Sequence, residues 1–109
     1  MCIRDSQLYV TTARRALIVG AGRAGEMLVR DLLRDQNYGF HPMGFVDDTP
    51  RKVGMDVHGV RVLGTCDDIE DVCRQHTVDL ILIAIPSADS KQMRRIVGLC
   101  EAAHLLRVR

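Results

Sequence analysis

A glycine-rich stretch near the N-terminus is the strongest chemical signal in the sequence. Residues 20–25, GAGRAG, carry the spacing Gly-x-Gly-x-x-Gly directly after the apolar run Ala16–Val19. In a strand-to-helix turn of this kind, Gly20 permits the tight bend, Gly22 lets the backbone approach a diphosphate, and Gly25 lets the helix lie close to the sheet. The amide groups at the helix start would then face the phosphates, where the helix dipole favours negative charge. The stretch therefore favours phosphate binding over a purely structural turn.

A pair of acidic residues closes the next predicted strand. Asp47 follows Gly25 by 22 residues, near the end of the run Met43–Asp48. A carboxylate at this place in a strand–helix–strand unit commonly accepts hydrogen bonds from an adenosine ribose. We expect this role for Asp47 first and for Asp48 second, with a plain turn leading into Pro50 as the alternative. A carboxylate here repels a 2′-phosphate, so Asp47 favours NAD over NADP.

Alternating strand and helix patterns must position these residues. Strands are expected over Ala16–Val19, Met43–Asp48, Val60–Gly64, Val78–Ile85 and 104–109, and helices over Arg23–Asp35, Cys66–His76 and from Asp89 or Ser90 onward. The pattern predicts an α/β fold, a Rossmann-like doubly wound parallel sheet of about five strands. With the predicted strands numbered along the chain, we expect the order 3-2-1-4-5 by analogy with other doubly wound sheets, with a right-handed crossover. Thr65 is the expected N-cap of the second helix.

The ligand crevice of such a sheet opens between the ends of the first and fourth predicted strands. The turn at Pro86 and Ser87 follows the fourth strand, where its backbone and hydroxyl could contact a bound nucleotide. An ordinary turn capped by Ser87 is an equal alternative, and Arg23 is either a phosphate ligand or a solvated surface cation. The candidate cofactor-binding residues are Gly20, Ala21, Gly22, Arg23, Ala24, Gly25, Asp47, Asp48, Pro86 and Ser87.

Composition argues against several classes of protein. The net charge of +1 gives no basic surface for nucleic acid. No apolar run approaches the roughly 18–20 residues that span a bilayer. The four cysteines have no CxxC spacing, which argues against a metal or redox site and fits a reducing, cytoplasmic setting.

One domain is expected over residues 14–109, after a linker at 1–13. Residues 1–6, MCIRDS, match the translation of a transposon end that is used to build sequencing libraries, so we expect a sequencing artefact there. The C-terminal residues stop inside a strand pattern, which indicates a domain truncated at its C-terminus.

Four segments in a fixed order carry a family resemblance: RRALIVGAG at 14–22, GFVDD at 44–48, HGVRVLG at 58–64 and DLILIAIPS at 79–87. With them the chain resembles the N-terminal Rossmann, CoA-binding-like domain of CapD-like polysaccharide biosynthesis proteins, the membrane-bound nucleoside-diphosphate-sugar epimerases and 4,6-dehydratases. The resemblance implies a cytoplasmic domain of a larger protein that is anchored in the bacterial inner membrane. It implies NAD as the bound dinucleotide, with NADP and then CoA as alternatives, and it leaves self-association open.

The resemblance further implies that a second domain, outside this chain, acts on a UDP-sugar with a bound NAD(P). Such chemistry uses a Tyr-x-x-x-Lys pair. Tyr9 is followed four residues later by Ala13, and Tyr38 by Pro42. The sequence therefore predicts no catalytic residues here. Two alternatives stay open, namely an accessory domain of a polyprenyl-phosphate sugar-1-phosphate transferase and a free-standing module that binds NAD(H) or CoA.

Overall fold

The computed structural model describes residues 14–35 and 39–103. The predicted linker at 1–13 and the predicted fifth strand at 104–109 lie outside the described residues. The elements are β1 Arg14–Val19, α2 Arg23–Arg34, β2 Phe40–Val46, the 3-10 turn η2 Pro50–Lys52, β3 Asp56–Val57, β4 Val60–Gly64, the 3-10 turn η3 Cys66–Asp68, α3 Ile69–Gln75, β5 Leu80–Ile83 and α4 Ser90–Ala102.

One sheet organises the domain, with strand order β3-β4-β2-β1-β5. The strands β4, β2, β1 and β5 are parallel, and they are the third, second, first and fourth strands expected from the sequence. The predicted order 3-2-1-4 is therefore confirmed for these strands. The central strand β1 has β2 on one side and β5 on the other, so the glycine loop that follows it leaves from the middle of the sheet.

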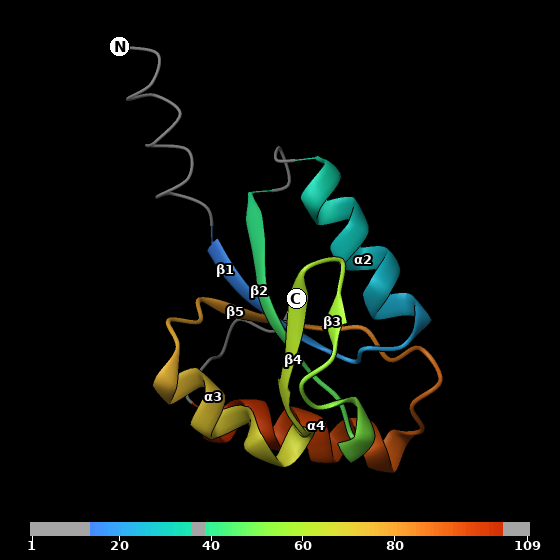
Figure 1. The fold of residues 1–109 in the computed structure, drawn as a ribbon. Helices are drawn as coiled ribbons and strands as arrows, with labels where there is room; N and C mark the ends of the chain where they lie inside the picture. The colour runs from blue at the N-terminus through green and yellow to red at the C-terminus, as the bar shows by residue number, and fades with distance from the viewer. Residues whose placement is uncertain (1–13, 36–38, 104–109) are drawn as a thin grey trace.

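Alternating side chains of the strands form two hydrophobic cores, one on each face of the sheet. Leu17 and Val19 of β1 point toward α3 and α4, whereas Ala16 and Ile18 point toward α2. Figure 1 shows α2 on one side of the sheet and α3 and α4 together on the other. The doubly wound arrangement is thus present, and burial on both faces explains why β5 and the Ala16–Val19 part of β1 are apolar.

β2 begins at Phe40, three residues before the predicted start, and it includes a proline. Pro42 pairs with Ala16, and the next pair along is Gly44 with Leu17, so Met43 is an extra residue in a bulge. The pairing of β2 with β4 begins only at Phe45. Pro42 therefore has a neighbouring strand on one side alone, and its missing N–H group is tolerated there.

The short strand β3 was not expected from the sequence, which indicated only a polar, glycine-containing stretch at 49–59. Val57 pairs antiparallel with Val60, and the two residues between them have positive φ, 55° at His58 and 83° at Gly59. A turn with two positive φ angles matches the twist of a tight hairpin. The hairpin extends the sheet beyond β4.

α2 begins at Arg23 and α4 at Ser90, as the sequence predicts, whereas the helix predicted from Cys66 starts with the 3-10 turn η3 and becomes α-helical only at Ile69. Thr65 and Asp68 form a reciprocal capping box ahead of α3, and Asp89 caps α4 by accepting a 2.8 Å hydrogen bond from the amide of Gln92. Within the described ranges, no helix has the length and hydrophobicity needed to cross a membrane.

Candidate functional site

The glycine loop fits tightly between the ends of the two neighbouring strands. The amide of Gly20 donates a 2.8 Å hydrogen bond to the carbonyl of Val46 at the end of β2. On the other side, a Cβ at Gly20 would lie 2.7 Å from the carbonyl oxygen of Ala84 and 2.8 Å from the Ile85 side chain. The φ angle of Gly20 is +111°, a value that L side chains rarely adopt. Both the close approach and the bend therefore require glycine.

Gly25 holds α2 against this loop. A Cβ at Gly25 would overlap the carbonyl oxygen of Gly20 and would lie 3.3 Å from the ring of Phe45. The residue is buried in the first turn of α2. Its role is close packing between helix, loop and sheet, as predicted from the spacing.

Gly22 differs from the other two glycines because it touches nothing that would exclude a side chain. Among the described residues, no heavy atom outside its immediate chain surroundings lies within 4 Å of a Cβ built there. Its backbone angles, φ −84° and ψ −160°, are open to other residues as well. Neither packing nor backbone conformation of the chain itself explains glycine here. The open space lies directly at the start of α2.

The first turn of α2 presents backbone amides without a protein cap. The first hydrogen bond of the helix runs from the amide of Glu26 to the carbonyl of Gly22, at 2.9 Å. The amides of residues 23–25 therefore have no acceptor within the helix. No side chain in the described part of the chain caps this helix, unlike α4, which Asp89 caps. This helix start offers hydrogen-bond donors and a positive dipole end to an anion.

Asp47, the residue expected at the ribose, lies against the glycine loop. Its Oδ2 accepts a 2.7 Å hydrogen bond from the amide of Ala21, and its Oδ1 accepts a 2.9 Å bond from the amide of Thr49. Burial by itself raises the pKa of this carboxyl, but these bonds and the nearby charge of Lys52 lower the pKa below its usual value of 3.8. The group is therefore an ionised carboxylate at neutral pH. It joins the turn after β2 to the glycine loop.

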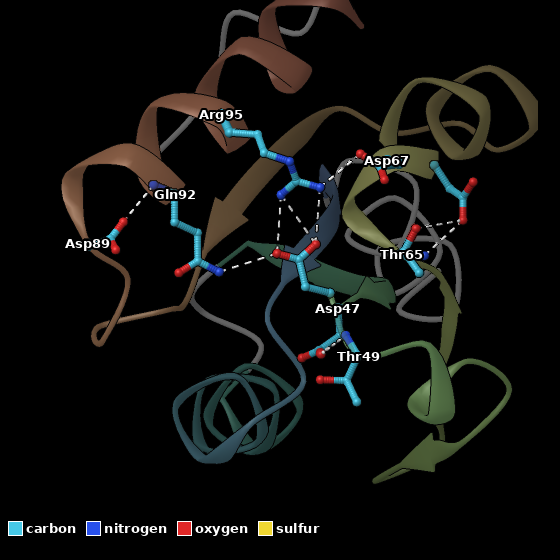
Figure 2. A network of polar contacts seen from close by, with 9 residues as sticks. Asp47, Thr49, Thr65, Asp67, Asp89, Gln92 and Arg95 are labelled. Atoms are coloured by element: carbon cyan, nitrogen blue, oxygen red, sulfur yellow. Dashed lines mark hydrogen bonds and ion pairs between the residues drawn. The ribbon is translucent and has the colours of Figure 1, made fainter.

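Asp48 lies in a different network from Asp47. The Arg95 guanidinium of α4 contacts both carboxylate oxygens of Asp48 at 3.2 to 3.4 Å, and it donates a 2.8 Å hydrogen bond to Asp67. Gln92 adds a 3.3 Å contact to Asp48. Figure 2 shows Arg95 reaching from α4 toward Asp67, with Gln92 beside it on the same helix. Asp48 thus connects the end of β2 to α4.

Burial alone raises the pKa of the Asp48 carboxyl, but hydrogen bonds from the Cys66 thiol and from Arg95 outweigh it and lower the pKa. The pKa of the Cys66 thiol changes in the opposite direction. Burial, with the adjacent Asp48 carboxylate, raises the pKa of Cys66 to about 12. A thiol in this state is a small core group and a poor nucleophile.

The remaining predicted residues lie around the loop. Arg23 is the first residue of α2 and is exposed, and Ala24 follows it half-buried. Pro86 and Ser87 are exposed and come directly after the segment that contacts Gly20. The helix that follows this turn takes its cap from Asp89, so Ser87 does not cap α4. That these residues touch a ligand stays a prediction.

Two residues to which the sequence assigned no role lie beside the aspartates. The ammonium group of Lys52 lies 3.9 Å from Oδ2 of Asp47, and Arg95 binds Asp48. Lys52 lies in the turn η2, which follows β2. A basic residue so close in sequence to Asp47 could have indicated the contact between the two side chains. Arg95 is 47 residues from Asp48, and only the packing of α4 reveals that contact.

Comparison with known proteins shows the family to which the chain belongs. The CoA-binding domain family matches residues 2–107. The capsular polysaccharide biosynthesis protein CapD of Staphylococcus aureus is 34% identical over 88 residues, which are 80% of this chain and 15% of that relative. The probable polysaccharide biosynthesis protein EpsC of Bacillus subtilis (strain 168) is 33% identical over 86 residues, 79% of this chain and 14% of the relative. The chain thus spans a small part of these relatives, and the resemblance inferred from the sequence is confirmed.

Solved structures agree on the architecture. The UDP-D-quinovosamine 4-dehydrogenase from Vibrio fischeri superposes with a TM-score of 0.77 at 29% identity, covering 84% of this chain and 73% of that chain. The Rex-family repressor RSP in complex with β-NADH superposes with a TM-score of 0.74 at 20% identity, covering 94% of this chain and 48% of that one. The Rossmann-like fold of nucleotide-binding domains is confirmed.

Proposed function

The chain belongs to the CoA-binding domain family, and from this premise we propose that its glycine loop binds an adenine nucleotide through the diphosphate. NAD, NADP and CoA share an adenosine diphosphate part. The diphosphate lies over Gly22 and accepts hydrogen bonds from the amides at the start of α2. Asp47 lies at the adenosine ribose, and the turn at Pro86 and Ser87 borders the far side of the diphosphate.

The open space at Gly22 is the observation that carries this proposal. Gly20 and Gly25 are explained by contacts within the chain, whereas a Cβ at Gly22 meets no described atom within 4 Å. A bound diphosphate at this position requires the backbone to be bare. The uncapped first turn of α2 supplies the donors that phosphate oxygens need.

At the level of the whole protein, we propose that this domain belongs to a nucleoside-diphosphate-sugar epimerase or 4,6-dehydratase of bacterial polysaccharide biosynthesis. Support comes from the two curated relatives, both polysaccharide biosynthesis proteins, and from the solved structure named as a UDP-sugar dehydrogenase. The domain itself binds a nucleotide, and the sugar chemistry takes place in a further domain. The nucleotide-binding domain lies on the cytoplasmic side of the inner membrane, to which the larger protein is anchored.

Titration calorimetry tests the binding proposal. The purified chain is titrated with NAD, NADP and CoA, and the same ligands are added in thermal unfolding. Binding heat and a raised melting temperature are expected for at least one nucleotide, because a ligand that binds only the folded state stabilises it. The Gly22→Val variant should lose both effects. Absence of heat and of any melting shift with all three nucleotides would reject the proposal.

A further inference from the structure

Lys52 is held at the edge of the proposed nucleotide site by a rigid turn. Its amide donates a 3.0 Å hydrogen bond to the carbonyl of Thr49, and its own carbonyl accepts a 3.0 Å bond from the amide of Met55. The next residues are tied to β4, since the amide of Gly54 donates a 2.8 Å bond to the carbonyl of Val62. The backbone that carries Lys52 is therefore fixed relative to the sheet.

The Lys52 ammonium lies beside the carboxylate that contacts the glycine loop. Its Nζ is 3.9 Å from Oδ2 of Asp47, and that oxygen is already 2.7 Å from the amide of Ala21. The side chain of Lys52 is 35% exposed, whereas that of Asp47 is 13% exposed. The cation is thus more accessible than the carboxylate that it contacts, and it can meet a charged group that arrives beside Asp47.

The Lys52 ammonium has hydrogen-bond donors that its contact with Asp47 does not use. An ammonium group has three donors, and a contact of 3.9 Å with one oxygen is longer than an ordinary charge-assisted hydrogen bond. A partly exposed pair of this kind contributes about 0–1 kcal/mol to stability. Stability therefore gives little reason for the position of Lys52, and the donors are available to an anion that arrives beside Asp47.

The hydrogen bonds to Asp47 change what this carboxylate does to a ligand. Both of its oxygens accept amide hydrogen bonds from the chain, from Ala21 and from Thr49, and Lys52 offsets its charge. Repulsion of a nearby phosphate is correspondingly reduced. The preference for NAD that follows from an aspartate considered alone is therefore weaker once the charge of Lys52 is included.

We propose that Lys52 recognises a phosphate monoester on the adenosine ribose, so that the site prefers NADP or CoA to the same nucleotides without that phosphate. This inference rests on the proposed function, since it assumes that the diphosphate lies at Gly22. The 2′-phosphate of NADP and the 3′-phosphate of CoA are the two sources of this chemistry. Lys52 determines the specificity for the ribose phosphate, and the amides of α2 bind the diphosphate that all of these nucleotides share.

Two matched ligand pairs test the inference by calorimetry on the 109-residue chain. CoA is compared with dephospho-CoA, and NADP is compared with NAD. The phosphate-bearing member of at least one pair should bind about tenfold more tightly or better, which corresponds to 1.4 kcal/mol. Preference in the first pair alone identifies a 3′-phosphate, and preference in the second pair alone identifies a 2′-phosphate. Equal or weaker binding of the phosphate-bearing member in both pairs would overturn the inference.

Variants in the turn that carries Lys52 distinguish recognition by this side chain from an effect of net charge. Lys52→Ala should reduce the preference within each ligand pair to within about twofold, and Lys52→Arg should retain the preference. Arg51→Ala removes one cation from the adjacent exposed position and should leave the preference intact. An equal loss in Arg51→Ala would mean that net charge sets the preference, and would overturn the inference. If no nucleotide binds at all, the proposed function fails as well, whereas binding without preference rejects Lys52 recognition alone.

Discussion

Replacing Gly22 by valine separates nucleotide binding from folding more cleanly than any other change in the loop. In the structure a Cβ at this position enters open space, with no described atom outside the adjacent residues within 4 Å. Its backbone angles of −84° and −160° are compatible with a β-branched residue. The valine would occupy the position that we assign to the diphosphate. Binding should be lost, and folding should be largely unaffected.

The expected change in unfolding free energy is small because two effects oppose each other. Restricting the unfolded chain by replacing glycine stabilises the fold by about 0.4–1 kcal/mol. Losing glycine at an N-cap, where valine is disfavoured, costs a comparable amount of roughly 0.5–1 kcal/mol. The net change should lie within about 1 kcal/mol, equivalent to a melting shift of roughly 4 °C or less for a domain of this size.

Gly25→Ala and Gly98→Ala provide the comparison. The first places a Cβ onto the Gly20 carbonyl oxygen, and overpacking of this kind typically costs about 1–3 kcal/mol. The second fills an open position in α4, where alanine is favoured by about 1 kcal/mol. Urea unfolding measures stability, and calorimetry with CoA and NADP measures binding.

Two results would refute this reasoning. If Gly22→Val destabilised the domain as much as Gly25→Ala, the space at Gly22 would be filled by the protein itself. If Gly22→Val bound nucleotide with the affinity of the parent chain, the diphosphate would lie elsewhere. Gly98→Ala should bind normally, and it controls for the general effect of replacing a glycine.

Three further outcomes follow from the polar groups. Asp47→Asn should cost about 1–3 kcal/mol at pH 7. Because the folded state lowers the pKa of Asp47 below 3.8, the carboxylate's contribution to stability is complete above the unfolded pKa and is lost as the pH falls through the folded value. In urea unfolding, the stabilities of wild type and variant should therefore converge as the pH is lowered through that range, and a constant difference would contradict this. Arg95→Ala should cost no more than about 1 kcal/mol, since the pair with Asp48 is partly exposed; a larger loss in thermal unfolding would contradict this. The thiols of Cys66 and Cys100, whose pKa values burial raises to about 12 and about 11, should resist iodoacetamide at pH 8 in the folded chain, and rapid labelling in peptide mass spectra would be inconsistent with their burial.

The glycine spacing predicted much of the site, because steric rules for glycine act locally. Gly20 and Gly25 have the roles that their positions indicate, the first in a bend of positive φ and the second in helix packing. The parallel sheet followed from the pattern, since apolar runs and helices alternate along the chain, and the strand order was expected by analogy with other doubly wound folds. The N-cap Thr65 was found because capping depends on a few neighbouring residues.

Longer-range packing decided what the sequence left open. Asp47 and Asp48 are chemically identical neighbours, yet successive residues at a strand end point in opposite directions. One contacts the glycine loop, and the other contacts Arg95. Which helix would lie beside Asp48 depends on how α4 packs, which no local pattern contains. The strand β3 was missed because it has only two residues, although Val57 and Val60 flanking a His-Gly pair were a usable hairpin signal.

Amide NMR during a titration with CoA or NADP tests the central claim most directly. Signals of residues 22–25 should show the largest shifts on adding nucleotide, because their N–H groups face the diphosphate in the proposed complex. Signals of α4 distant from the loop, such as that of Gly98, should change little. Unchanged signals at 22–25, with shifts confined to another part of the chain, would contradict the assignment of this loop as the nucleotide-binding site.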